Sequence, residues 1–149
     1  MKLRIEIDEE APEEIVIRAK SADARLRRLQ TAIEGALGSR ELAVKKADEE
    51  CFLPFAELLY FETSDKTAYV HTVHDCFVCP LHLNELERLL PAEFVRCSKS
   101  AIINTQLIRS LIRYPTGIAK ASFKGSDKYA YVSRMYYKIV RDTIEEMRL

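Results

Sequence analysis

The sequence predicts a β-rich α+β fold, in which short antiparallel sheets are followed by a C-terminal helix. Three observations lead to this prediction. Apolar and polar residues alternate in many short segments, as they do in half-buried strands. Turn-forming residues separate these segments at short intervals. Helical spacing is confined to an early, a central and a C-terminal stretch of the 149-residue chain, of which 48% is hydrophobic. This size supports one domain with a small appendage.

Residues 1–40 are expected to form a small N-terminal β-β-α unit. Its elements are two strands and a helix, at residues 3–7, 15–17 and 21–38. Ser21 or Asp23 can cap the start of the helix, because either side chain can accept a hydrogen bond from a backbone N–H of the first turn. Gly38 can end the helix, since glycine readily takes the left-handed conformation that follows many helices.

Residues 41–149 are expected to form the β-rich domain. After two short strands between residues 41 and 59, the expected strands are residues 59–62, 67–72, 76–80, 94–95, 101–103, 108–113, 118–123 and 129–132. Leucines at helical spacing run from Leu83 to Leu90. Pro91 ends this short helix, because proline disfavours helical backbone in the residue before it. A last helix is expected from about Arg134 onward.

The most informative stretch is a polar, basic crossing between two apolar segments, at Phe94-Val95 and residues 101–103. It contains Arg96, Ser98, Lys99 and Ser100 and no acidic residue. Cations neutralise phosphate charge, while hydroxyl and backbone N–H groups fix the register of a protein on a nucleic acid. The crossing is therefore a candidate nucleic-acid loop, with an ordinary solvated loop as the alternative.

The zero net charge of the chain hides an uneven distribution of charge. Residues 95–149 contain 11 Lys and Arg against 4 Asp and Glu, which gives +7. Residues 1–94 contain 12 against 19, which gives −7. A basic C-terminal part is the electrostatic footprint expected of a nucleic-acid-binding surface.

Four segments, in this order and spacing, carry a resemblance to a known family. They are Leu58-Leu59-Tyr60-Phe61-Glu62, Leu81-His82-Leu83-Asn84-Glu85-Leu86-Glu87, the crossing from Phe94 to Asn104, and Tyr131-Val132-Ser133-Arg134. Together they resemble the LytTR type of bacterial DNA-binding domain over about residues 41–149. The resemblance implies three small antiparallel sheets in an elongated arrangement, with loops at one edge that enter successive major grooves of duplex DNA. It implies a sequence-specific transcriptional regulator and not an enzyme.

The same resemblance implies which residues contact DNA. Arg134 matches the base-contacting arginine at the start of the family's last helix, and Lys99 matches a polar residue of its central loop. Arginine suits base reading, because its planar fork can bond O6 and N7 of guanine together. Lys66 lies in a loop where some members carry a further contact, although Ala68 stands where some of them have histidine. On general grounds, Ser98, Ser133 and Lys138 are expected to contact phosphate.

Two alternative functions stay open. One is a protein-interaction module, in which the basic face meets an acidic partner. The other is a zinc site, because the chain contains the ligand pattern His74, Cys76, Cys79 and His82. Against zinc, an odd spacing on a strand sends the two cysteines to opposite faces, so that only one of them is buried. No residues combine into a recognisable catalytic site, and no cofactor is expected.

The remaining expectations concern the setting of the protein. Cysteines without a secretion signal suggest reduced thiols in the cytoplasm, and Cys97, inside the basic crossing, is expected to have a lowered pKa. No apolar stretch approaches the ~18 residues that span a membrane. Residues 1–40 are too few for a receiver domain, so aspartyl phosphorylation is not expected to be the switch. They are expected either to join two chains into a homodimer or to cap the core.

Overall fold

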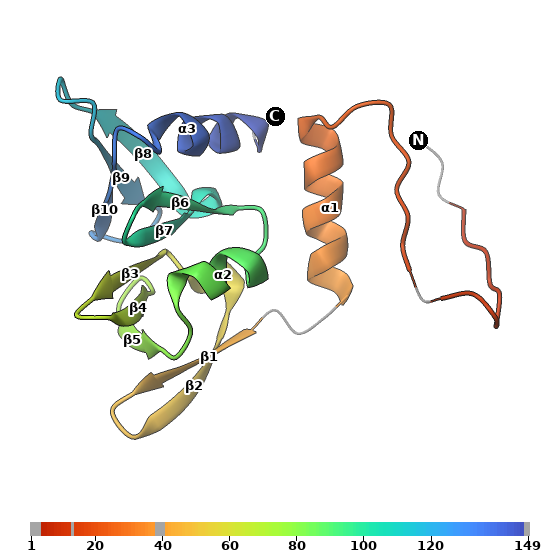
Figure 1. The fold of residues 1–149 in the computed structure, drawn as a ribbon, viewed down its shortest axis with the longest axis horizontal. Helices are drawn as coiled ribbons and strands as arrows, with labels where there is room; N and C mark the ends of the chain where they lie inside the picture. The colour runs from red at the N-terminus through yellow and green to blue at the C-terminus, as the bar shows by residue number, and fades with distance from the viewer. Residues whose placement is uncertain (1–3, 13, 38–40, 148–149) are drawn as a thin grey trace.

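The computed structural model describes residues 4–12, 14–37 and 41–147. The helices of these residues are α1 (Ala24–Leu37), α2 (Leu83–Leu89) and α3 (Tyr137–Glu146). The strands are β1 (Glu41–Lys46), β2 (Glu49–Pro54), β3 (Tyr60–Ser64), β4 (Thr67–His71), β5 (Cys76–Cys79), β6 (Phe94–Ser98), β7 (Ala101–Asn104), β8 (Ile108–Arg113), β9 (Ala119–Phe123) and β10 (Tyr129–Val132). Short 3-10 turns, η1 (Phe55–Glu57) and η2 (Thr105–Leu107), follow β2 and β7. Figure 1 shows the strands gathered on one side and α1 standing on the other.

Seven strands form one antiparallel sheet in the order β2-β1-β5-β4-β3-β7-β6. The β3–β4 ladder at its centre pairs every residue of the two strands, from Tyr60 with His71 to Ser64 with Thr67. By contrast, β1 joins β5 through one residue pair, Lys45 with Val78. The family resemblance implied three small sheets. The described strands form two hydrogen-bonded sheets, because this one pair attaches the β1–β2 hairpin to the larger sheet.

The second sheet is antiparallel and has the order β10-β9-β8. Ala119, Ala121 and Phe123 alternate along β9 with less buried residues, so one face of this sheet is apolar. Val140 and Ile144 of α3 pack on that face. The expected C-terminal helix is thus present. It begins at Tyr137 rather than near residue 134, because the residues after β10 first make a turn.

Strands β3 and β7 lie between two hydrophobic cores. Phe61 and its cross-strand neighbour Ile102 belong to the core that contains α2. Tyr60 and its neighbour Ile103 belong to the core beneath α3. Successive residues of a strand point to opposite faces, so one pair of strands contributes to both cores.

The two strands expected at residues 3–7 and 15–17 are not formed by the described part of the N-terminal region. Residues 4–12 and 14–23 have no helix or strand. The exposed fractions of their large apolar side chains are 77% for Ile5, 92% for Ile7 and 57% for Ile15. A strand forms only where its backbone groups find hydrogen-bond partners, and this segment finds no neighbouring strand among the described residues.

The early helix is present as α1, and Asp23 caps it. Asp23 Oδ1 accepts a hydrogen bond from the Leu26 N–H over 3.0 Å, as expected of one of the two candidate caps. The predicted end at Gly38 lies outside the described residues. Arg27 Nη1 lies 3.0 Å from Glu146 Oε2 of α3, which links the helix to the β-rich domain. No helix in residues 4–12, 14–37 and 41–147 is long and apolar enough to cross a membrane.

Candidate nucleic-acid interface

The three chain segments expected to meet DNA lie next to one another. They are the β3–β4 turn, the β6–β7 loop and the segment from β10 to α3, which carry Lys66, Lys99 and Arg134. The Thr63 N–H at the end of β3 donates to the Ser100 carbonyl over 2.9 Å. The Ser133 N–H donates to the Cys97 carbonyl over 2.8 Å. These two bonds place the β6–β7 loop between the other two segments. In Figure 1 the β3–β4 hairpin points to the left edge, away from α1.

The β3–β4 turn presents Lys66 at its tip. Asp65 and Lys66 have φ angles of 49° and 66°, and the ladder closes directly before them at Ser64 with Thr67. Two successive left-handed residues suit the twist of a tight hairpin, but the usual residues at such positions are asparagine and glycine. Lysine seldom adopts this conformation. Its side chain is exposed and makes no ion pair with any described residue.

Arg96 braces the β6–β7 loop from within the protein. Its Nε donates to the Ser98 carbonyl over 3.1 Å, and Nη2 donates to the Lys99 carbonyl over 2.7 Å. Its Nη1 lies 3.0 Å from Glu87 Oε2 of α2, and the side chain is only 17% exposed. Arg96 is therefore occupied by the loop backbone and by α2. The exposed cation of the loop is Lys99, which makes no ion pair with a described residue.

The two serines expected to contact phosphate differ in exposure. Ser98 is partly exposed, and its Oγ accepts a hydrogen bond from the Ser100 N–H over 3.2 Å, which shapes the loop. Ser133 Oγ is buried and has no hydrogen-bond partner among the described residues. A hydroxyl that solvent does not reach cannot meet a phosphate in this conformation. The structure therefore does not support the Ser133 side chain as a contact, although its backbone links β10 to β6.

Arg134 follows Ser133 directly and is exposed. Its aliphatic stem lies over Gly117 in the β8–β9 loop, so closely that a Cβ on Gly117 would come within 2.6 Å of Arg134 Cδ. Its guanidinium makes no ion pair within the described part of the chain. Arg134 thus combines a supported stem with an available fork of donors, which is the combination that base reading requires.

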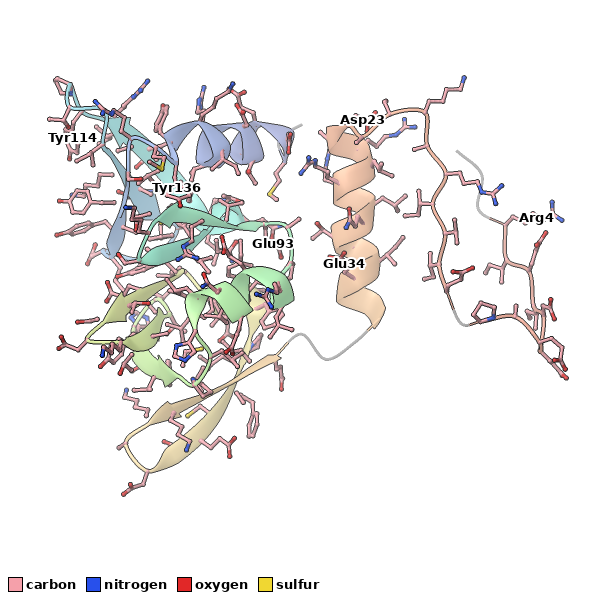
Figure 2. The ribbon with its side chains drawn as sticks, in the orientation of Figure 1. Arg4, Asp23, Glu34, Glu93, Tyr114 and Tyr136 are labelled. Atoms are coloured by element: carbon pink, nitrogen blue, oxygen red, sulfur yellow. The ribbon has the colours of Figure 1, made fainter. Side chains whose placement is uncertain are left out.

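The start of α3 adds further positive potential next to Arg134. Lys138 is exposed in the first turn, which contains no acidic residue and has no side-chain cap. The free N–H groups of a first turn carry partial positive charge and favour an anion nearby. The Arg113 guanidinium lies over the Tyr137 ring, 4.3 Å from its centroid. Figure 2 marks Tyr114 in the β8–β9 loop and Tyr136 directly before this helix.

A groove of about 1020 Å³ adjoins the loops, between the larger sheet and β10. Ser98 and Tyr131 are among its lining residues. Three further lining residues contact one another. His71 Nε2 lies 2.8 Å from Glu62 Oε1, and the His71 ring stacks on Tyr60 with 4.3 Å between centroids. Burial lowers the pKa of His71, although the hydrogen bond to Glu62 acts to raise it. The contact ties the last residue of β4 to the middle of β3, at the end of the hairpin away from the turn that carries Lys66.

The described structure does not support the zinc alternative. Cys76 is exposed and Cys79 is buried, as the odd spacing predicted. Within residues 4–12, 14–37 and 41–147, no three His, Cys, Asp or Glu side chains are grouped as a metal ion would require. The lowered pKa expected for Cys97 is wrong. This thiol is fully buried in the core beneath α3, and burial raises its pKa to about 12.

Comparison with known proteins identifies the family. The family described as LytTr DNA-binding domain matches residues 48–145. The chain belongs to the LytTR family. This membership confirms the family that the four sequence motifs predicted, and it makes the basic loops described above part of a DNA-binding domain.

The LytTR assignment agrees with a solved structure and with curated relatives. The LytTr DNA-binding domain of a Bacillus cereus protein has a TM-score of 0.66 at 27% identity, and the match covers 72% of this chain and 98% of that domain. Two uncharacterized HTH-type transcriptional regulators from strains of Staphylococcus aureus are 33% and 32% identical over 89 residues. That match covers 60% of this chain, and the chain spans about 60% of the length of those relatives. The fold likeness confirms the predicted β-rich α+β class.

The described residues of this LytTR chain contain no helix-turn-helix. Strands separate α1 from α2 and α2 from α3, so no two of these helices follow one another directly. The loop cations were predicted from the sequence, but the bracing role of Arg96 and the contact of Gly117 with Arg134 were not. The local sequence gives little sign of either role, because Arg96 is paired with Glu87 of α2 and Gly117 contacts Arg134, which follows β10.

Proposed function

We propose that this LytTR protein is a sequence-specific transcriptional regulator that binds duplex DNA through its three neighbouring segments. One observation supports this most strongly. The exposed cations Lys66, Lys99, Arg134 and Lys138 make no ion pair with any described residue, whereas Arg96 in the same region is paired. Cations left unpaired at adjoining loops are available to the phosphates and base edges of a duplex.

In this proposal one of the four cations reads a base, and the other three contact the duplex on either side of it. Arg134 reads a base, because its guanidinium is available and its stem is held. Lys138 meets phosphate beside the first turn of α3. Lys99 and Lys66 extend the contact along the duplex from the other two segments. The Thr63–Ser100 hydrogen bond joins the segments that carry these two lysines, so both can contact the same stretch of the duplex.

Selection of bound fragments from genomic DNA tests this proposal. We expect enrichment of a common motif, with log affinity falling linearly against log salt by about 0.9 for each phosphate contact. The absence of any enriched motif would contradict it. If the same protein instead bound an acidic protein partner with high affinity, the alternative of a protein-interaction module would gain support.

We also propose that the N-terminal region joins two copies of the chain. Its apolar side chains are exposed in the single chain, with Ile15 at 57% and Val16 at 60%. Figures 1 and 2 show this segment as an extended chain on the far side of α1, with Arg4 well away from the strands. An antiparallel pairing centred on Val16 sets Glu14 opposite the partner's Arg18. These opposite charges therefore favour a second copy as the partner. Pairing along the strand edge also gives hydrogen-bond partners to the N–H and C=O groups of the extended backbone.

The mass of the full-length protein in solution, measured by light scattering, tests the dimer. We expect a dimer for the natural chain and a monomer for Val16→Glu, because the substitution sets two carboxylates opposite each other at the centre of the pairing. Glu9→Lys, outside the paired segment, is the matched control and should remain dimeric. A natural chain that is monomeric both free and on a two-site duplex contradicts the proposal.

A further inference from the structure

We propose that Gly117 is a positioning residue for DNA recognition, because the space left by its missing side chain sets the direction of Arg134. This inference rests on the proposed function, in which Arg134 reads a base. Gly117 itself touches no DNA in this account. It acts on base preference through the arginine that lies over it.

The contact between the two residues is close along the arginine stem. A Cβ built on Gly117 would lie 2.6 Å from Arg134 Cδ, 2.8 Å from Cγ and 3.4 Å from Cβ. Carbon atoms that are not bonded to each other make favourable contacts only at about 3.5–4.0 Å. The stem therefore occupies the volume that any other residue at position 117 would fill. Gly117 is accordingly buried, although its neighbours Thr116 and Ile118 are exposed.

The loop under the stem is held in a defined conformation. The Tyr114 N–H donates to the Ile118 carbonyl over 2.8 Å, and the Gly117 N–H donates to the Tyr114 carbonyl over 2.9 Å. Gly117 has a φ of 90°, in the left-handed region that favours glycine. At the base of the loop, Arg113 stacks on Tyr137 of α3. This contact joins the base of the loop to the start of α3.

The backbone on both sides of Arg134 is also held. The Ser133 N–H bonds to the Cys97 carbonyl over 2.8 Å, and the Tyr136 N–H bonds to the Ser133 carbonyl over 3.1 Å. The stem then rests on Gly117, and the guanidinium remains without an ion pair to a described residue. An arginine ordered up to its guanidinium loses less conformational freedom on binding, and its fork is aimed before DNA arrives.

The substitution Gly117→Ala should change the direction of the Arg134 side chain without preventing the chain from folding. The atoms that its Cβ would meet belong to a flexible side chain, so the chain can fold if the Arg134 stem moves aside. The moved fork no longer matches the plane of the base edge. The left-handed φ adds backbone strain in any such variant. Gly125 supplies the matched control, because its φ is 71° and a Cβ there meets nothing within 4 Å.

The experiment compares full-length natural protein with Gly117→Ala, Gly125→Ala, Arg134→Ala and the double variant Gly117→Ala/Arg134→Ala. Each protein selects duplexes from a random-sequence pool, and thermal unfolding is measured in parallel. We expect Gly117→Ala to lose roughly 5- to 150-fold of base discrimination at one position, the range for a single bidentate arginine contact. Gly125→Ala should keep the natural motif, although backbone strain at its left-handed φ should lower its unfolding temperature as it does for Gly117→Ala. The double variant should select as Arg134→Ala does.

The outcomes separate this inference from the proposed function. If Arg134→Ala changes the motif and Gly117→Ala does not, Gly117 has no positioning role while base reading by Arg134 stands. If Gly117→Ala and Gly125→Ala change the motif alike, backbone strain explains both and the inference fails. If Arg134→Ala leaves the motif unchanged, the assignment of the reading residue is wrong, and the positioning role is lost with it.

Discussion

The guanidinium of Arg96 holds the backbone carbonyl of Lys99 through a 2.7 Å hydrogen bond from Nη2. The arginine lies inside the protein and the lysine side chain points out of it. One basic residue therefore orders the loop backbone, and the other is presented by it. Hydrogen bonds to a charged group are among the stronger ones in proteins, so the shape of this loop depends on Arg96.

Replacing Arg96 with glutamine should loosen the loop. We expect the free energy of unfolding to fall by about 1–3 kcal/mol, because the carbonyls of Ser98 and Lys99 lose a charged donor. DNA affinity should fall for all sequences alike. Glu87→Gln is the control, since it removes the half-exposed ion-pair partner but keeps both carbonyl bonds, and should change stability by no more than about 1 kcal/mol. Urea unfolding of both variants measures this, and equal losses would contradict it.

Arg134 and Lys138 should respond differently to alanine substitution. Arg134→Ala should weaken binding by about 1–3 kcal/mol and relax base preference at one position. Lys138→Ala should weaken all sequences alike and make the salt slope shallower by about one unit. Titration of selected and scrambled duplexes at several salt concentrations distinguishes the two. The assignment of the reading residue fails if Arg134→Ala leaves the preferred sequence and its affinity unchanged.

The free energy of unfolding should decrease at pH values below the ordinary histidine pKa of 6.5, and His71 should contribute to this decrease. Burial lowers the pKa of this side chain from 6.5. The unfolded chain therefore binds a proton at His71 at a higher pH than the folded chain, so the free energy of unfolding falls as the pH drops through 6.5 and below. His71→Phe keeps a ring to stack on Tyr60 and removes the titrating group. Urea unfolding between about pH 7.5 and 5 should then show a flatter profile for the variant; parallel profiles contradict this.

The cysteines should differ in reactivity toward a soluble alkylating reagent. Cys76 is exposed, whereas Cys79 and Cys97 are buried. Burial also keeps Cys97 protonated, since it raises the pKa of this thiol to about 12. Mass spectrometry of the native protein after brief alkylation at neutral pH should show Cys76 modified well before the other two. In urea all of them should react. Early modification of Cys97 would contradict its place in the core.

The fold was largely predictable because its strands carry local signals. Alternation gave the positions of β3, β4 and β8 to β10, and polar turn residues separated them. The odd spacing of Cys76 and Cys79 predicted their opposite faces. Asn104 shapes the turn after β7, because its Oδ1 accepts a hydrogen bond from the Gln106 N–H over 3.1 Å. In each case, residues close in sequence determine the outcome.

The predictions that the structure contradicts concern contacts between segments that are far apart in the sequence. The basic neighbours of Cys97 suggested a lowered pKa, but packing under α3 buries the thiol and reverses the direction. Ser133 looked like a phosphate contact until tertiary packing enclosed its hydroxyl. The N-terminal alternation that predicted strands has no neighbouring strand within the described chain. No local pattern encodes the presence or absence of such neighbours.

The two cores that share β3 and β7 have a consequence for the order in which the domain opens. Phe61 with Ile102 faces one core and Tyr60 with Ile103 faces the other, so separating these two strands disrupts both cores at once. Their amide protons should exchange with solvent deuterium only through global unfolding. The loop that carries Lys99 continues directly into β7, and is therefore attached to the part of the protein expected to exchange most slowly. Local fluctuations that fray the termini should leave the conformation of this loop, and the DNA contact proposed for it, undisturbed.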